Sequence, residues 1–320
     1  MIEKIVAAVN NVLWGDGLSF NQSVPVVGDI NFATGPLLIY MLVFCGLWFT
    51  WKLRAVQIRH FGYMFSIMKG STKSTTEGIS SFQALCTSLS ARVGTGNLAG
   101  VAVAISLGGA GAIFWMWMIA LIGMATGFAE SVLGQLYKVK DDNGEFRGGP
   151  AYYIKQGLNK TWLAVAFSLC LFLGYGFVFS AVQANTITDA LENAYAIPTL
   201  YSGIAIIALA AMIVVGGLRG IARFAELAVP FMGVGYIIVA LVITFMNISA
   251  VPDMIMHIIY SAFGLEEAGA GALGAAIKNG IQRGLYSNEA GSGSVPHAAA
   301  GAAPNPNHPV SQGYVQMLGV

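Results

Sequence analysis

Long apolar stretches follow one another along this chain and constrain its fold more than any other feature. A helix needs about 20 mostly apolar residues to cross the hydrocarbon core of a bilayer. Stretches of about that length or longer occur at 34–51, 79–107, 112–136, 161–186, 199–217, 228–248 and 253–284. They are too long for β-strands and do not alternate with a period of two. The sequence therefore predicts an all-α polytopic membrane protein, with helices and not strands in these stretches.

The content of charged residues supports a membrane location. Charged residues make up 10% of the 320 residues and hydrophobic ones 56%, whereas a soluble domain carries about 25% charged residues. The net charge of +1 excludes a nucleic-acid binder that relies on a basic surface. Three cysteines lie in apolar runs and four histidines are scattered, so neither a disulfide framework nor a metal site is expected. Residues 1–20 lack the pattern of a cleaved signal peptide, so the first span is expected to remain in the mature protein.

The basic residues alternate between the two sides of the predicted spans. Every second connection is basic, and these connections, with the end of the last span, hold 14 of the 16 Lys and Arg residues. The intervening connections at 108–111, 187–198 and 249–252 hold none. Because basic loops stay in the cytoplasm, the N-terminus is expected outside the cell membrane. A further apolar stretch opens near Val310 and runs to Val320, so we expect the natural protein to be longer.

The second apolar stretch is interrupted near its middle, at Ser90-Ala91-Arg92-Val93-Gly94-Thr95-Gly96-Asn97. Each glycine costs a helix interior roughly 1 kcal/mol relative to alanine, and an arginine at the bilayer centre costs about 2.5–3.5 kcal/mol or more. Unwound backbone at that depth must line a cavity or be buried by protein. It offers N–H groups to an anion and carbonyls to a cation. The alternative is a glycine-mediated helix contact through Gly96 and Gly100; a dinucleotide-binding loop is excluded because no strand precedes it.

A second interruption is predicted in the stretch from Asp253 to Leu285, which is too long for one simple crossing. The sequence 260–271 is rich in glycine and carries Glu266 and Glu267. This stretch and 79–107 are five spans apart and therefore cross the membrane in opposite directions. Two interrupted helices of opposite direction are typical of inverted-repeat transporters.

Several motifs then resemble one known family, the alanine or glycine:cation symporters. They are Gly94-Thr95-Gly96-Asn97-Leu98-Ala99-Gly100, Gly111-Ala112-Ile113-Phe114-Trp115, Gly148-Gly149-Pro150-Ala151-Tyr152-Tyr153, Gly216-Gly217-Leu218-Arg219-Gly220 and Arg283-Gly284-Leu285-Tyr286-Ser287-Asn288-Glu289-Ala290-Gly291. The last is the most specific. The resemblance implies a single transmembrane domain over 1–320 with a leucine-transporter-like inverted-repeat bundle. In it, 34–51 is an extra leading helix, 79–248 the first repeat and 253–320 the start of the second.

The resemblance also implies the ligands and their positions. It implies Na⁺-coupled uptake of a small amino acid, alanine or glycine, with Na⁺ as coupling ion and no other cofactor. The amides of Thr95 and Gly96 would face the substrate carboxylate, with Gly94 as a further substrate-binding residue. The carbonyls of Ser90 and Val93 would line a Na⁺ site. Asn97 would be a ligand of the substrate or of Na⁺. The opposing wall would comprise Ser261, Ala262, Phe263 and Gly264, with Phe177 as a further candidate for the substrate pocket.

Some residues keep two interpretations. Glu266 and Glu267 depart from the family pattern, as does Ser292; the two glutamates either pair with Arg92 or lie in water. Glu130 is favoured as a structural partner of an arginine over a proton carrier. Gln183 is favoured as a helix cap over a site residue.

The turn at Ser287-Asn288-Glu289 is expected on the cytoplasmic side, with a structural role favoured over gating. For the whole chain, a proton-coupled transporter of the same fold remains the alternative function. A channel and an intramembrane enzyme rank below both.

Overall fold

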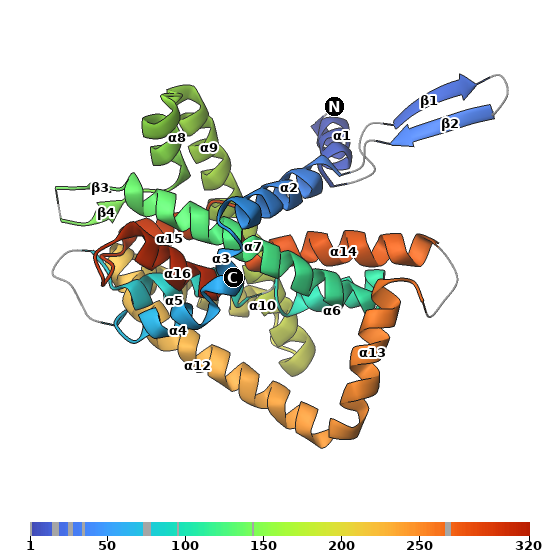
Figure 1. Ribbon diagram of the computed structural model, residues 1–320. Coiled ribbons are helices and arrows are strands. Elements are labelled where there is room, and N and C mark those ends of the chain that lie inside the picture. Colours follow the sequence, from blue (N-terminus) through green and yellow to red (C-terminus); the bar gives the residue numbers. More distant parts are fainter. Residues whose placement is uncertain are drawn as a thin grey trace.

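The computed structural model describes residues 2–14, 19–24, 28–33, 36–72, 78–94, 96–142, 144–265 and 270–320. Helices dominate these residues (Figure 1). The prediction of an all-α protein is confirmed in its main point. Two short hairpins lie outside the apolar stretches. One pairs β1 (Ser19–Val24) with β2 (Gly28–Ala33), and the other pairs β3 (Val139–Lys140) with β4 (Phe146–Arg147).

Among the described residues, three helical segments are long and apolar enough to cross a bilayer. They are α7 (Gly111–Leu136), the continuous segment Thr161–Tyr195 and α12 (Gly217–Met246). The second consists of α9 (Thr161–Leu173), the π-helical turn η1 (Gly174–Phe179) and α10 (Ser180–Tyr195). Shorter apolar helices include α2 (Leu37–Lys52) and α11 (Thr199–Val214). The span predicted at 228–248 therefore begins earlier, at Gly217.

Two interrupted helices lie side by side in the centre. The first consists of α5 (Ser81–Arg92) and α6 (Ala99–Gly108), and the second of α14 (Ala270–Asn288) and α15 (Val295–Gly301). Because α14 packs against α6 and α15 against α5, the two interrupted helices run antiparallel. The start of α5 is also joined to the end of α15, since Ile79 N–H donates to the Gly301 carbonyl (3.0 Å) and Ala303 N–H to the Ile79 carbonyl (2.9 Å).

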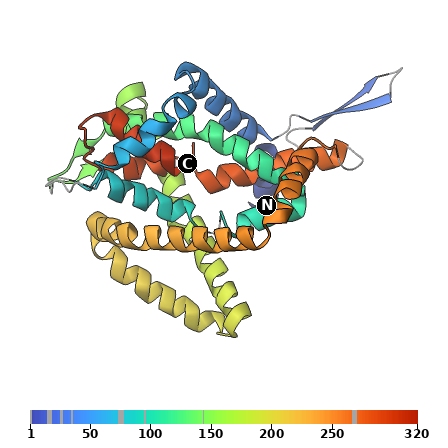
Figure 2. The same ribbon diagram turned by 60° about the horizontal axis from the view of Figure 1, so that its bottom comes forward.

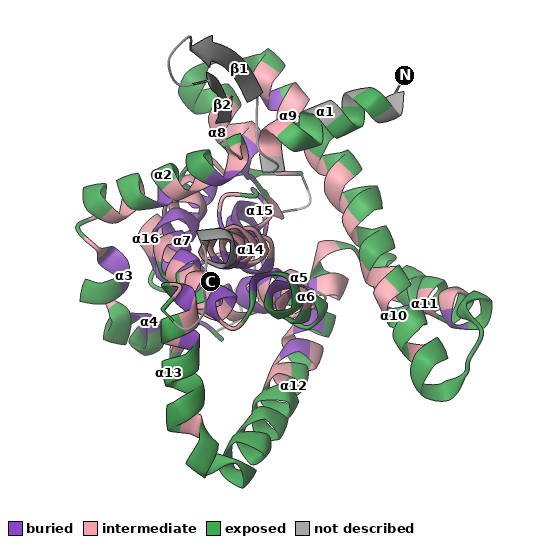
Figure 3. Ribbon diagram, turned by 90° about the vertical axis from the view of Figure 1, so that its right-hand side faces the viewer, coloured by how far each residue is buried: buried purple, intermediate pink, exposed green. Residues whose placement is uncertain are grey.

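Helix α7 forms the centre of the packing, with α14, α15 and α16 (Pro309–Gly319) against it. Glycines allow α14 to approach closely: a Cβ on Gly280 would lie 2.5 Å from the Ala112 carbonyl oxygen. Buried residues concentrate around α7, α14, α15 and α5, whereas α10 to α13 are mostly exposed (Figure 3). Helices α10 and α11 extend away from this centre (Figure 2).

The remaining helices are short or peripheral. They are α1 (Ile2–Trp14), α3 (Val56–Arg59), α4 (Phe61–Met68), α8 (Pro150–Leu158), the 3₁₀ turn η2 (Ile248–Ala250) and α13 (Val251–Ala262). The interruption predicted within 253–284 is present, because α13 ends at Ala262 and α14 begins at Ala270. Glu266 and Glu267, and with them their proposed pairing with Arg92, lie outside the described residues.

Candidate functional site

The first interruption begins where the hydrogen-bond ladder of α5 stops. Val93 N–H still bonds to the Leu89 carbonyl (2.7 Å), but Gly94 N–H donates to the nearby Arg92 carbonyl (3.0 Å). The N–H groups of Asn97 and Leu98 both donate to the Gly94 carbonyl, at 3.1 and 3.2 Å. The backbone at 93–94 and 96–98 thus forms turns between two helices, as the glycines predict. Thr95 lies outside the described residues.

Asn97 joins the two interrupted helices. Its Nδ2 donates to the Arg92 carbonyl (2.7 Å), and its Oδ1 accepts a hydrogen bond from the Ser287 hydroxyl at the end of α14. Gly96 is buried beside it, and a Cβ there would lie 3.3 Å from the Ser287 Cα. The close approach of the two chains at this point therefore depends on a residue without a side chain.

The interruption that faces the first one lies between Asn288 and Val295, not at the predicted 260–271, and is called the second interruption from here on. Glu289, Gly291 and Gly293 have positive φ angles of 53°, 91° and 87°, a conformation that glycine adopts readily and other residues rarely. Ser287, Asn288 and Glu289 are buried. This segment was expected to be a cytoplasmic turn; instead it is packed inside the bundle, opposite the first interruption.

Helix α7 supports the second interruption through Glu130. Its Oε2 accepts a hydrogen bond from Gly291 N–H (3.1 Å). The Glu289 carboxylate accepts one from the Ser294 hydroxyl (2.6 Å), and Ser292 donates to the Glu289 carbonyl (2.6 Å). Hydroxyl and backbone N–H groups thus donate hydrogen bonds to both carboxylates and to the Glu289 carbonyl in this buried turn.

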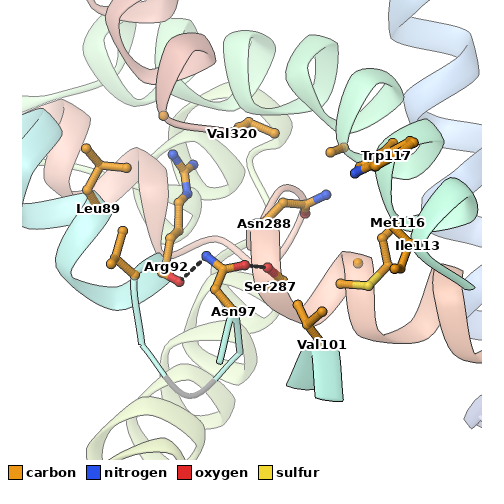
Figure 4. A pocket seen from close by; sticks show the side chains of 14 residues that line it. Leu89, Arg92, Asn97, Val101, Ile113, Met116, Trp117, Ser287, Asn288 and Val320 are labelled. Carbon is orange, nitrogen blue, oxygen red and sulfur yellow. Dashed lines mark hydrogen bonds between the residues drawn. The ribbon is translucent and has the colours of Figure 1, made fainter. Parts of the chain in front are cut away.

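A cavity of about 290 Å³ lies where the interruptions meet α7 (Figure 4). Its polar side includes Arg92, Asn97, Ser287 and Asn288, and its apolar side includes Ile113, Met116 and Trp117 of α7. The Asn288 Nδ2 is buried without a hydrogen-bond partner among the described residues. A buried donor of this kind costs free energy unless a ligand or water meets it.

Helix α10 brings a further side chain to the first interruption. A Cβ on Gly94 would lie 3.0 Å from the Gln183 Nε2. Gln183 lines a small pocket together with Gly96, Phe179 and Tyr286. The rings of Phe179 and Tyr286 stack at 5.4 Å, which ties η1 to α14. Gln183 therefore reaches the site, in contrast to the capping role favoured from the sequence.

Of three further predicted site residues, Phe177 and Ser90 are exposed and Val93 lies at the cavity. Phe177 is 59% exposed and contacts Phe172 on its own helix. Ser90 is exposed, and its hydroxyl bonds to the Thr87 carbonyl (2.7 Å). Val93 lines the cavity. The prediction thus located the first interruption but took Phe177 in place of Phe179.

The predicted opposing wall, Ser261 to Gly264, packs against the start of α7. Ser261 Oγ accepts a hydrogen bond from Gly111 N–H (3.0 Å), and the Ala262 carbonyl accepts one from Trp115 Nε1 (3.1 Å). The Phe263 ring lies 5.2 Å from that of Phe114. Residues 261–264 do not line the cavity beside Asn97. The segment that faces the first interruption is instead 287–294.

Long apolar helices and interrupted helices around a buried cavity define an α-helical integral membrane protein. The chain belongs to the sodium:alanine symporter family, which it matches over residues 19–320.

The chain is similar to several curated transporters. It is 49% identical to the uncharacterized transporter YaaJ of Escherichia coli (strain K12) over 290 residues, which are 89% of this chain and 61% of YaaJ. It is 45% identical to the probable sodium/glutamine symporter GlnT of Bacillus subtilis (strain 168) over 321 residues, 100% of this chain and 62% of GlnT. With the sodium/alanine symporter AgcS of Methanococcus maripaludis it shares 42% identity over 305 residues, 92% of this chain and 66% of AgcS.

These relatives are transporters and not enzymes, as expected from the sequence. The chain spans about 60% of the length of YaaJ and GlnT.

Proposed function

We propose that this protein is a secondary transporter of the cell membrane that carries a small amino acid into the cell together with Na⁺. The observation that supports this most directly is the cavity at Asn97, between two antiparallel interrupted helices. Its volume of about 290 Å³ lies at the lower end of the roughly 300–1,000 Å³ of ligand pockets, so it suits a small solute.

The chemistry of the first interruption suits the two ligands. Backbone N–H groups at Thr95 and Gly96 would bind the substrate carboxylate at the positive end of α6, with Gly94 beside them. The carbonyls of Ser90 and Val93, with Asn97, would bind Na⁺ as coupling ion, because hard cations prefer oxygen ligands. The arrangement is leucine-transporter-like, with 79–248 as first repeat. In the second repeat, 287–294 takes the place that the sequence assigned to Phe263.

A second candidate function is proton-coupled transport by the same fold. The observation that favours it is the pair of carboxylates at the second interruption, Glu130 on α7 and Glu289 in the turn. A buried carboxylate that gains and loses a proton is a common device of proton-coupled carriers.

Uptake into proteoliposomes tests these functions. Purified protein is supplied with labelled alanine, glycine, glutamine or leucine under an inward Na⁺ gradient, or with choline in place of Na⁺ and an inward proton gradient. We expect alanine or glycine uptake that requires Na⁺. Uptake that continues in choline and follows the proton gradient would replace the first function by the second, and preferred uptake of glutamine or leucine would correct the substrate.

A further inference from the structure

Three ionisable side chains from different elements lie together at the meeting point of the interruptions. Arg92 ends α5 and is 2% exposed, and Glu289 in the second interruption is 5% exposed. Glu130 comes from α7. Arg92 and Glu289 line one small pocket, and Glu130 Oε2 accepts a hydrogen bond from the N–H of Gly291, two residues after Glu289 (3.1 Å). Arg92, Glu130 and Glu289 together form the charge triad.

The hydrogen-bonding capacity of Arg92 is largely unused. Nη1 makes one long hydrogen bond, to the Gln316 carbonyl (3.4 Å). Nε and Nη2 are buried without a hydrogen-bond partner among the described residues. A guanidinium binds a carboxylate with two parallel hydrogen bonds, and donor pairs such as Nε and Nη2 provide the required geometry.

Arg92 lies between two spaces. It lines the cavity of about 290 Å³ with Asn97 and Asn288, and also the small pocket that contains Gln183 and Glu289. In Figure 4 its side chain extends from α5 past Leu89 toward Val320. Arg92 therefore borders both the cavity proposed for the substrate and the pocket that contains Glu289.

With both glutamates ionised, the charge triad has a net charge of −1. Burying a net charge is costly, so a bound monovalent cation stabilises this group. Oxygen atoms suitable for such a cation surround Glu289. The Ser294 hydroxyl donates to its carboxylate, Ser292 donates to its carbonyl, and Tyr175 donates to Ser292 (3.0 Å).

We propose that Arg92 couples cation binding to substrate binding. Without a cation, the guanidinium neutralises Glu289 and Glu130. When a monovalent cation joins these carboxylates, Arg92 is released and binds the carboxylate of the amino acid in the adjacent cavity. The inference rests on the proposed function and adds a coupling residue to it. The cation is either Na⁺ or a proton, since both supply the one positive charge required.

Thermodynamic coupling makes this proposal measurable. If a cation raises the affinity for alanine by some factor, alanine raises the affinity for the cation by the same factor, and such factors are typically about 5–150. We expect the affinity of the purified wild-type protein for labelled alanine, measured at equilibrium, to be higher in saturating Na⁺ than in choline by a factor in this range.

Three variants then separate the roles. Arg92→Gln is expected to reduce the coupling factor to about 1 and to weaken alanine binding in Na⁺ at least tenfold. Glu289→Gln removes one negative charge as a bound cation does, so alanine should bind tightly in choline. Arg92→Lys keeps the charge but not the paired donors. It should retain cation binding while alanine affinity falls, and it provides the test if Arg92→Gln does not fold.

Arg147→Gln on the exposed β4 and Glu192→Gln on the exposed end of α10 are the matched controls, and both should keep the wild-type factor. The proposal would be overturned if folded Arg92→Gln kept the wild-type coupling factor. It would also be overturned if Arg92→Lys kept both the wild-type coupling factor and the wild-type alanine affinity. A Glu289→Gln protein that still needs Na⁺ to bind alanine would overturn it as well.

A second arm identifies the cation. Alanine binding is repeated in choline at acidic and neutral pH. Tyr175 and Tyr153 are the other ionisable groups near the charge triad. If alanine binds more tightly at acidic pH and Arg92→Gln abolishes this effect, the coupling cation is the proton. If alanine binding responds to Na⁺ but not to pH, the coupling cation is Na⁺. If wild-type protein responds to neither cation, the proposed function itself fails, which is distinct from a failure confined to the variants.

Discussion

At Asn97, one amide side chain holds both interruptions in place, through the Arg92 carbonyl and the Ser287 hydroxyl. Asn97→Ala would remove both hydrogen bonds. The Arg92 carbonyl keeps the bond from Gly94 N–H, but the buried Ser287 hydroxyl loses this acceptor, at a cost of about 1–3 kcal/mol. We expect the initial rate of amino-acid uptake to fall at least tenfold while the protein remains folded. Asn193→Ala, which removes an exposed amide on α10, is the control and should keep the wild-type rate. Equal rates for both variants would show that Asn97 has no role in transport.

Lys138 provides a pH-dependent test on the basic side of the protein. Just after α7, its ammonium donates to the Ala302 carbonyl (2.7 Å) and to Gln135 Oε1 (2.9 Å). Burial lowers the pKa of Lys138 from 10.5 to about 8. Between those two values the unfolded chain binds a proton that the folded protein has released, so the free energy of unfolding rises with pH in this window.

We therefore expect the melting temperature of the wild-type protein to gain more between pH 8 and pH 10 than that of Lys138→Met. Thermal unfolding in detergent across this range gives the comparison. Since other groups also titrate there, the difference between the two proteins is the relevant quantity. Parallel curves for the two proteins would contradict the assignment.

The sequence predicted some of these residues because their chemistry is unusual for a membrane helix. Gly94, Gly96 and Asn97 disfavour a continuous helix, and Arg92 is costly at the centre of a bilayer. Gln183 gave no such signal, because a polar residue near a helix end serves equally well as a cap. Its position depends on the π-helical turn before it, and this tertiary feature also places Phe179, in place of Phe177, at the site.

Among the elements, α14 and α7 depend on glycine for their close packing. A Cβ on Gly280 would lie 2.5 Å from the Ala112 carbonyl oxygen and 2.7 Å from the Trp115 Cβ, so Gly280→Ala forces the helices apart. On the same helix, a Cβ on Gly274 meets nothing within 4 Å among the described residues. Small residues at helix contacts are how membrane helices pack closely.

We expect Gly280→Ala to lower the melting temperature and the yield of folded protein in detergent. Gly274→Ala should match or exceed the wild type, because alanine favours a helix over glycine by roughly 1 kcal/mol. Size-exclusion chromatography and thermal unfolding measure both. If the two variants have the same melting temperature and yield, the contact between α7 and α14 does not require a glycine at position 280.

Hydropathy predicted most helices because length and apolar content are local properties. The predicted stretches at 112–136 and 199–217 differ from α7 and α11 by at most three residues at either end. The position of the second interruption was not predictable in this way. Both 260–271 and 287–294 are rich in glycine and polar residues, and contact with Asn97 distinguishes them only after folding.

For the whole molecule, the distribution of basic residues predicts how the protein lies in the membrane. The β3–β4 hairpin should face the cytoplasm and the end of α10 the outside. In a protein with Cys45, Cys86 and Cys170 replaced, a membrane-impermeant maleimide applied to intact cells should label Ala196→Cys. Asp142→Cys should react only after permeabilisation. The opposite pattern would invert the topology, including the predicted outer N-terminus.

The π-helical turn Gly174–Phe179 has a consequence for the geometry of the whole site. A π turn contains about one residue more than an α turn, and one residue corresponds to about 100° of rotation in an α-helix. Deleting a residue there would restore regular α-helical winding and rotate α10, which carries Gln183, relative to α9, which carries Trp162. Gln183 is thus aimed at Gly94 by a single surplus residue, and a family member without it would present another face of α10 to its cargo.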